Sequence, residues 1–99
     1  MKYTEHVQFK EHRRWLFEQV WSGAALLARQ PKDYLGREFL DGQYQGYVMA
    51  LALHTDRDPD RIRQLTDRQE LWEFLKNGPS WKAKINRDYD RAMRKERDG

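Results

Sequence analysis

The sequence predicts an all-α fold, a compact single-domain bundle of four to five helices over residues 1–99. Three prolines, at positions 31, 59 and 79, divide the chain, and apolar residues between them recur at helical spacing without the alternation of strands. A length of 99 residues suits one domain. Four Trp, five Tyr and four Phe supply a core, although the mean hydropathy of −1.11 taken alone suggests disorder. The expected helices cover 4–29, 34–54, 59–65, 67–77 and 80–95.

The first segment is predicted to be a long core helix, with Thr4 as its N-cap and Pro31 just past its end. Its apolar and small residues fall on two adjoining stripes, which together make the broad face that a core helix buries. One stripe holds Phe9, Leu16, Val20, Gly23 and Leu27, and the other holds Phe17, Trp21, Ala24 and Ala28.

The second segment is predicted to be a helix capped by Asp33. Six of its residues recur at alternating steps of four and three, which is a helical period: Leu35, Phe39, Gly42, Gly46, Met49 and Leu53. A glycine within a helix costs about 1 kcal/mol relative to alanine, so we expect both glycines to be buried where a second backbone approaches closely. Gly23 and Ala24 form a matching small site, so the first two helices should pack as a close antiparallel pair. A turn at Asp41 and Gly42 is the alternative.

Three shorter helices are expected to follow. Asp58 is the predicted N-cap of the first, with a proline at its first helical position. Residues 66–69 have the form of a capping box for the second, and Gly78 ends that helix. Ser80 is the predicted cap of the last helix, which should fray beyond residue 94. Its apolar stripe is Trp81, Ile85, Tyr89 and Met93.

Several function classes are excluded by residue type and spacing. The absence of cysteine removes disulfides, thiolate metal sites and cysteine nucleophiles. The aspartates from Asp56 to Asp60 resemble the start of a calcium loop, but Arg61 stands where that loop needs glycine. Neither serine lies in a nucleophile-elbow context, and the three histidines lack the spacing of helical metal ligands. We therefore expect no enzyme, no catalytic residue, no metal and no cofactor. The histidines are His6, His12 and His54.

No membrane partner is expected either. The longest apolar runs, 23–28 and 48–53, fall far short of the roughly 20 residues that span a bilayer. The N-terminus also lacks the apolar region of a secretory signal, so we expect a soluble, cytoplasmic protein.

The net charge of +3 lies entirely in the C-terminal fifth of the chain. Residues 1–79 carry 12 basic and 12 acidic side chains, which leaves seven basic and four acidic ones for 80–99. The five basic residues on one face of the last helix predict contacts with phosphates, with Trp81 or Tyr89 available to stack on bases. The alternative interpretation is an amphipathic helix that docks its apolar stripe on the core. These five residues are Lys84, Arg87, Arg91, Arg94 and Lys95.

The aromatic residues point to a protein partner. A small domain buries only about 60–65% of its surface, so some of these rings should be exposed. Tyr, Trp and Arg are enriched at the energetic centres of protein interfaces. We therefore expect a small non-enzymatic binding protein, an adaptor or inhibitor that occupies a surface of a larger protein or nucleoprotein partner. The alternatives are DNA or RNA binding through the basic C-terminal helix, and a homo-oligomer whose exposed aromatic residues pair with themselves. The predicted partner-binding residues are Arg13, Arg14, Trp15, Tyr44 and Tyr47.

Overall fold

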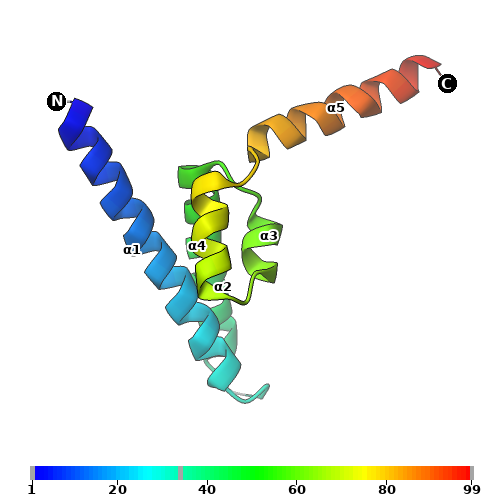
Figure 1. The fold of residues 1–99 in the computed structure, drawn as a ribbon. Coiled ribbons are helices and arrows are strands. Elements are labelled where there is room, and N and C mark those ends of the chain that lie inside the picture. Colours follow the sequence, from blue (N-terminus) through cyan, green and yellow to red (C-terminus); the bar gives the residue numbers. More distant parts are fainter. Residues whose placement is uncertain (1, 34, 99) are drawn as a thin grey trace.

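Five helices form the structure, and no strand occurs among the residues that the computed structural model describes, 2–33 and 35–98 (Figure 1). Side chains are described over 7–33 and 35–97. The predicted all-α fold and the close packing of the first two helices are confirmed. The helices are α1 (Lys2–Arg29), α2 (Arg37–Thr55), α3 (Pro59–Gln64), α4 (Arg68–Asn77) and α5 (Trp81–Asp98).

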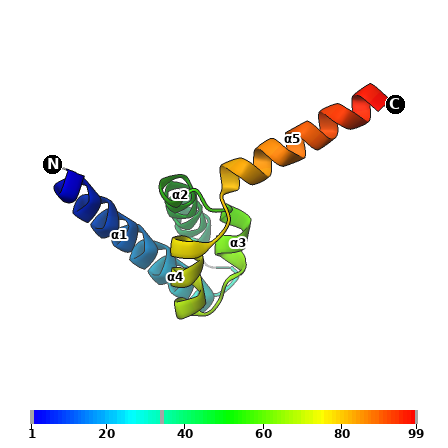
Figure 2. The same cartoon turned by 45° about the horizontal axis from the view of Figure 1, so that its top comes forward.

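The hydrophobic core lies where the C-terminal half of α1, α2, α3 and α4 meet. Helices α1 and α2 run antiparallel, and α3 and α4 lie against them, whereas α5 leaves the bundle (Figure 2). Each fully buried aliphatic or aromatic side chain contributes about 1.5–3 kcal/mol, so this cluster holds the four helices together. The buried apolar residues are Leu16, Phe17, Val20, Val48, Leu51, Ala52, Ile62, Leu71 and Leu75.

The molecule is more extended than a sphere of its length. Its radius of gyration is 16.7 Å, and its principal extents are 50, 45 and 21 Å. A compact chain of this length would have a radius of gyration of about 13 Å. The difference arises because α5 and the N-terminal half of α1 project from the core on opposite sides (Figure 1).

Most helix ends lie within a few residues of their predicted positions. Asp58 caps α3 and accepts the Asp60 N–H at 2.9 Å, with a proline at the first helical position, as predicted. Ser80 Oγ accepts the Ala83 N–H at 3.2 Å, which confirms the predicted cap of α5. Helix α5 continues to Asp98, so the fraying expected beyond residue 94 is not observed.

Three predicted caps are wrong. Helix α1 begins at Lys2, so Thr4 lies inside its first turn. Helix α2 begins at Arg37 after Gly36, which makes no side-chain cap hydrogen bond, and its predicted first residue, 34, lies outside the described residues. Asp33 is therefore not a cap. Helix α4 is capped by Asp67, whose carboxylate accepts the N–H of residue 70 at 2.9 Å, so the box starts one residue later than expected.

Gly78 ends α4 for a steric reason. Its φ of −69° is open to any residue, so the left-handed conformation common at this position does not explain the glycine. A Cβ at this position would lie 2.6 Å from the carbonyl oxygen of Phe74 and 2.7 Å from a carbon of its ring. The chain turns so tightly against the last turn of α4 that only glycine fits.

The predicted buried stripe of α2 is wrong. Gly42 and Gly46 have no atom within 4 Å of where a Cβ would stand, so neither glycine lies at the contact with α1. Gly23 on α1 does allow a close approach, because a Cβ there would lie 3.3 Å from Tyr44 Cδ2. Helix α2 has two apolar faces with the same period, and it buries the other one. That face consists of Val48, Leu51, Ala52 and Thr55.

Two arginines hold helix ends in place. Arg57 donates from Nε to the Phe74 carbonyl at 3.0 Å and from a terminal nitrogen to the Lys76 carbonyl at 3.2 Å, so it satisfies carbonyls at the end of α4. Arg37 donates to the carbonyls of Leu27 and Gln30 at 3.0 and 3.1 Å, which fastens the end of α1 to the start of α2. Charged donors near a helix C-terminus also stabilise its dipole.

Candidate binding surfaces

The position of α5 depends on one residue, Asp56. With φ 55° and ψ 49° it adopts the left-handed conformation that ends α2. Its carboxylate accepts hydrogen bonds from the Ser80 hydroxyl and, at 2.9 Å, from the Lys82 N–H. Its carbonyl accepts the Trp81 N–H at 3.0 Å. Asp56 therefore closes α2 and anchors the first turn of α5.

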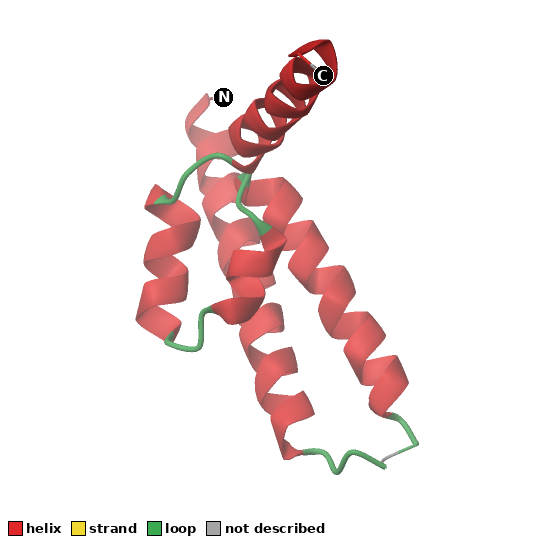
Figure 3. Ribbon diagram, turned by 90° about the vertical axis from the view of Figure 1, so that its right-hand side faces the viewer, coloured by secondary structure: helices red, strands yellow, loops and turns green. Residues whose placement is uncertain are grey.

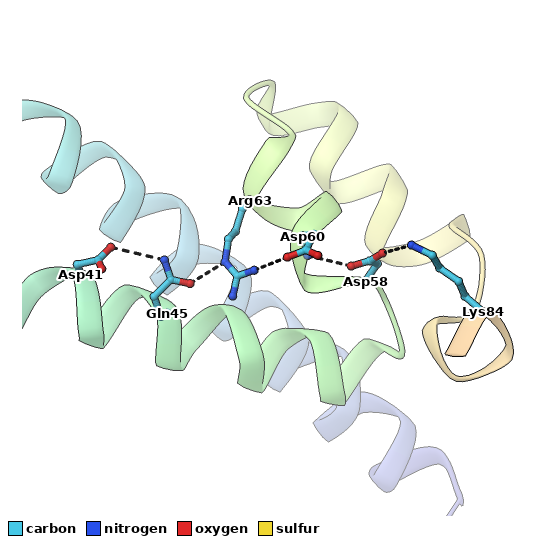
Figure 4. Close-up of polar contacts among 6 residues, drawn as sticks. All are labelled: Asp41, Gln45, Asp58, Asp60, Arg63 and Lys84. Carbon is cyan, nitrogen blue, oxygen red and sulfur yellow. Dashed lines mark hydrogen bonds and ion pairs between the residues drawn. The ribbon is translucent and has the colours of Figure 1, made fainter. Parts of the chain in front are cut away.

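A chain of polar contacts also links α5 to α3 and α2 (Figure 4). It begins where Lys84 Nζ donates to the Asp58 carboxylate at 2.8 Å. The Asp60 backbone N–H donates to the same Asp58 carboxylate at 2.9 Å, and Arg63 donates to the Asp60 carboxylate at 2.8 Å. Arg63 Nε also donates to the Gln45 side chain on α2 at 2.6 Å. These contacts fix the first turns of α5, while the remainder of the helix extends away from the bundle (Figures 1 and 2).

The charged groups where α5 joins the bundle stabilise one another. The hydrogen bond from the Ser80 hydroxyl lowers the pKa of Asp56, and so does the hydrogen bond from the Lys82 N–H. The ammonium of Lys84 lowers the pKa of Asp58, and Asp58 in turn raises the pKa of Lys84. The aspartates of the calcium-like segment therefore act as helix caps and ion-pair partners. Within the described side chains, no cluster of three or more His, Cys, Asp or Glu has an arrangement that could hold a metal ion.

Beyond its first turn, α5 presents an apolar stripe to solvent. Trp81 packs partly against the core, but Ile85 is 48% exposed and Tyr89 is 64% exposed, and Met93 is also exposed. The interpretation that this stripe covers the core is therefore wrong for residues 85–93. The helix is amphipathic, with its apolar side unpartnered within the described part of the chain.

The predicted basic face lies on the same helix, on the side opposite the apolar stripe. Lys84 forms the ion pair with Asp58, so one of the five predicted residues is already occupied. The other four are exposed, and none forms a salt bridge with a described residue. They are Arg87, Arg91, Arg94 and Lys95.

A series of contacting aromatic rings crosses from α1 to α2. Trp15 meets Tyr47 edge-on at 5.9 Å between ring centroids, so two predicted partner-binding residues lie together. His12 stacks on Trp15 at 6.1 Å and meets His54 edge-on at 4.9 Å. Phe9 stacks on His54 at 4.2 Å. Sequence reasoning missed the outer rings, because it places Phe9 in the core and considers the histidines as metal ligands or as surface and capping residues.

The other predicted partner-binding residues have different surroundings. The Arg13 guanidinium lies over the Trp72 ring at 5.2 Å, toward α4. Arg14 is exposed beside a surface hollow that Phe17 and Trp72 also line. Tyr44 is half-buried against Gly23, and burial raises the pKa of its hydroxyl. Tyr44 also lines the same surface hollow as Tyr47, so it continues the contact of Trp15 with Tyr47, whereas Arg13 and Arg14 lie toward α4.

The outer face of α2 is an exposed apolar surface that sequence reasoning placed in the core. Phe39 is 74% exposed and Leu53 is 70% exposed, and Met49 and the two glycines lie exposed between them. Exposed apolar patches on a small protein indicate interaction sites. The helical period of these apolar residues marks a continuous apolar face, but it does not show whether that face is buried in the core or exposed.

Comparisons with known proteins add no identification. The chain matches no protein-family model, no curated protein and no solved structure. In the described part of the chain, no helix combines the length and apolar composition needed to cross a membrane.

Proposed function

We propose that this chain is a small non-enzymatic binding protein that occupies a surface of a larger protein partner, as an adaptor or an inhibitor, and that α5 is the segment that docks. The observation that carries the proposal is the unpartnered apolar stripe on a projecting helix. Amphipathic helices with residues at steps of four on one face are bound in hydrophobic grooves by many proteins. In α5 these residues are Ile85, Tyr89 and Met93.

The proposed contact gives the apolar stripe and the basic side different roles. Burial of the exposed half of Ile85 contributes on the order of 1 kcal/mol, so Ile85→Ala should raise the dissociation constant about fivefold. A carboxylate at the same position would be buried without a partner, so Ile85→Glu should weaken binding on the order of tenfold or more. The arginines on the opposite side of α5 favour a partner with an acidic surface, and they act mainly on the association rate.

Affinity capture from a nuclease-treated extract of the native cell tests this function. Wild type, Ile85→Glu and Ala83→Glu are compared, because the last adds the same charge at an exposed position of α5 away from the apolar stripe. A protein retained by wild type and Ala83→Glu, and lost with Ile85→Glu, is the expected result. Binding is then measured directly with the isolated partner. Equal retention by all three proteins would contradict the proposal.

Nucleic-acid binding is a second candidate, favoured by the exposed arginines of α5. Four phosphate contacts, from Arg87, Arg91, Arg94 and Lys95, would give a salt slope of about −3.6, or roughly a hundredfold loss of affinity between 50 and 200 mM salt. Retention on DNA or RNA at low salt, with this slope and its loss in Arg87→Glu/Arg91→Glu, would support it. The acidic residues at 88 and 90 lie on the same helix and weigh against it.

A further inference from the structure

The outer face of α2 points away from the core. Figure 3 shows α2, the helix at the lower right, at one edge of the molecule, with the rest of the bundle on its other side. Phe39 and Leu53 are largely exposed, and Gly42 and Gly46 face open space. From residue 42 to residue 55 the sequence has no Asp, Glu, Lys or Arg, although 35% of the whole chain is charged. We call this face, together with Leu35 just before the helix, the α2 stripe.

The α2 stripe is symmetric about position 44. Its residues fall at equal distances on either side of that point, and each lies opposite one of similar size. Leucine is paired with leucine at the two ends, one large side chain is paired with another at the next step, and glycine is paired with glycine nearest the centre. The pairs are Leu35 with Leu53, Phe39 with Met49, and Gly42 with Gly46.

This symmetry makes the stripe complementary to itself. A two-fold axis through position 44 would set a second α2 antiparallel to the first, with each residue opposite the one that balances it. In a two-fold interface, residue i contacts j and residue j contacts i, which the pairs inside α2, Phe39 with Met49 and Gly42 with Gly46, satisfy. Phe39 of one copy would lie at the level of Met49 of the other, next to Gly46 and Ala50, whose small size leaves room for the ring.

The charges on α2 favour the same orientation. Glu38 and Asp41 are exposed near the start of the helix, and no described basic residue forms a salt bridge with either. In a parallel pair each carboxylate would face its own copy, which is unfavourable. In the antiparallel register Glu38 lies at the level of Ala50, and Asp41 lies at the level of Tyr47. The two copies of Glu38 are then about 18 Å apart along the helix axes, and the two copies of Asp41 are about 9 Å apart.

The glycines explain why the contact would be close. Helix axes pack about 8–10 Å apart, at a distance set by the side chains at the crossing point. Four glycines, two from each copy, would form that crossing. Each costs about 1 kcal/mol of helix propensity, and nothing in the monomer offsets this cost.

We propose that two copies of this chain associate through the α2 stripe in an antiparallel pair. The inference is independent of the proposed function, because α5 and the α2 stripe share no residue.

Sedimentation velocity over a wide range of protein concentration tests the association. Wild type should shift from monomer toward dimer as its concentration rises, and Phe39→Glu should weaken this association on the order of tenfold or more. Gln64→Glu, an exposed position at the end of α3, is the matched charge control and should behave as wild type. Circular dichroism establishes that each variant is folded. Wild type that stays monomeric at every concentration would overturn the proposal. It would do so even if Phe39→Glu reduced binding to a different protein, because the α2 stripe would then bind that protein and not a second copy.

Cysteine cross-linking tests the orientation, since the chain has no cysteine of its own. In the antiparallel pair two copies of Leu53→Cys lie about 27 Å apart along the helix, so they should not cross-link with a short bismaleimide. A mixture of Phe39→Cys and Met49→Cys should cross-link, because these two positions of α2 lie opposite each other in the proposed register. Efficient cross-linking of Leu53→Cys alone would indicate a parallel pair and overturn the proposed register.

Discussion

Alanine at Gly42 and Gly46 should stabilise the monomer. A Cβ at either position meets no atom within 4 Å, so the substitution creates no clash and gains only helix propensity. The gain is about 0.8–1.0 kcal/mol at each site, or about 2 kcal/mol for the double variant. Unfolding a chain of this length carries an entropy of about 0.2 kcal/mol per kelvin, so the midpoint of thermal unfolding should rise by about 10 °C.

The assay is urea and thermal unfolding followed by far-ultraviolet circular dichroism, at a dilution at which the protein is monomeric. Gly23→Ala is the matched control within a helix. Its Cβ would lie 3.3 Å from Tyr44 Cδ2, so displacement of that ring offsets the gain in propensity. Stability should change little or fall in this variant. A loss of stability in Gly42→Ala/Gly46→Ala would refute the reasoning, because it would mean that the outer face of α2 is covered in the monomer.

Four further outcomes are expected, each measured by urea unfolding. Leu51→Ala should lower the free energy of unfolding by about 3 kcal/mol because it leaves a cavity, whereas Leu53→Ala, two residues along but exposed, should change it by less than about 1 kcal/mol. Arg57→Leu should cost about 2 kcal/mol, since it leaves carbonyls at the end of α4 without their charged donor. Gly78→Ala should destabilise by about 1–3 kcal/mol through its clash with α4, and a neutral result would contradict the tight turn. Folding lowers the pKa of Asp56, so its contribution to the free energy of unfolding is present above the unfolded pKa and is lost as pH falls below about 4. Asp56→Asn should therefore lose less stability between neutral and acidic pH than wild type. A variant with the same dependence of stability on pH as wild type would contradict this role of Asp56.

The helical fold was predictable because helix boundaries depend on local chemistry. Proline and the caps at Asp58 and Ser80 act within a few residues of each helix end, and the structure confirms them. Long-range hydrogen bonds leave no such pattern. The Arg57 guanidinium reaches carbonyls 17 and 19 residues away, and nothing in the local sequence indicates that partner.

The candidate surfaces were only partly predictable. The contact between Trp15 and Tyr47 and the hollow that Tyr47 shares with Tyr44 agree with their grouping from the sequence, whereas Arg13 lies toward α4. Period alone could not decide which face of α2 is buried. The buried face carries Val48 and Leu51, and the exposed face repeats at the same spacing, so only the position of α1 distinguishes them.

The joint at Asp56 has a mechanical consequence for capture of a partner. Helix α5 has 18 residues and is about 27 Å long, so a rotation of roughly 20° at the joint would displace its far end by about 9 Å. Hydrogen bonds to Asp56 and the ion pair with Lys84 resist that rotation at the N-terminal end of α5. A rigid N-terminal end limits the range of positions that the C-terminal end of α5 can occupy. It also reduces the orientational entropy that remains to be lost when the tip engages a groove.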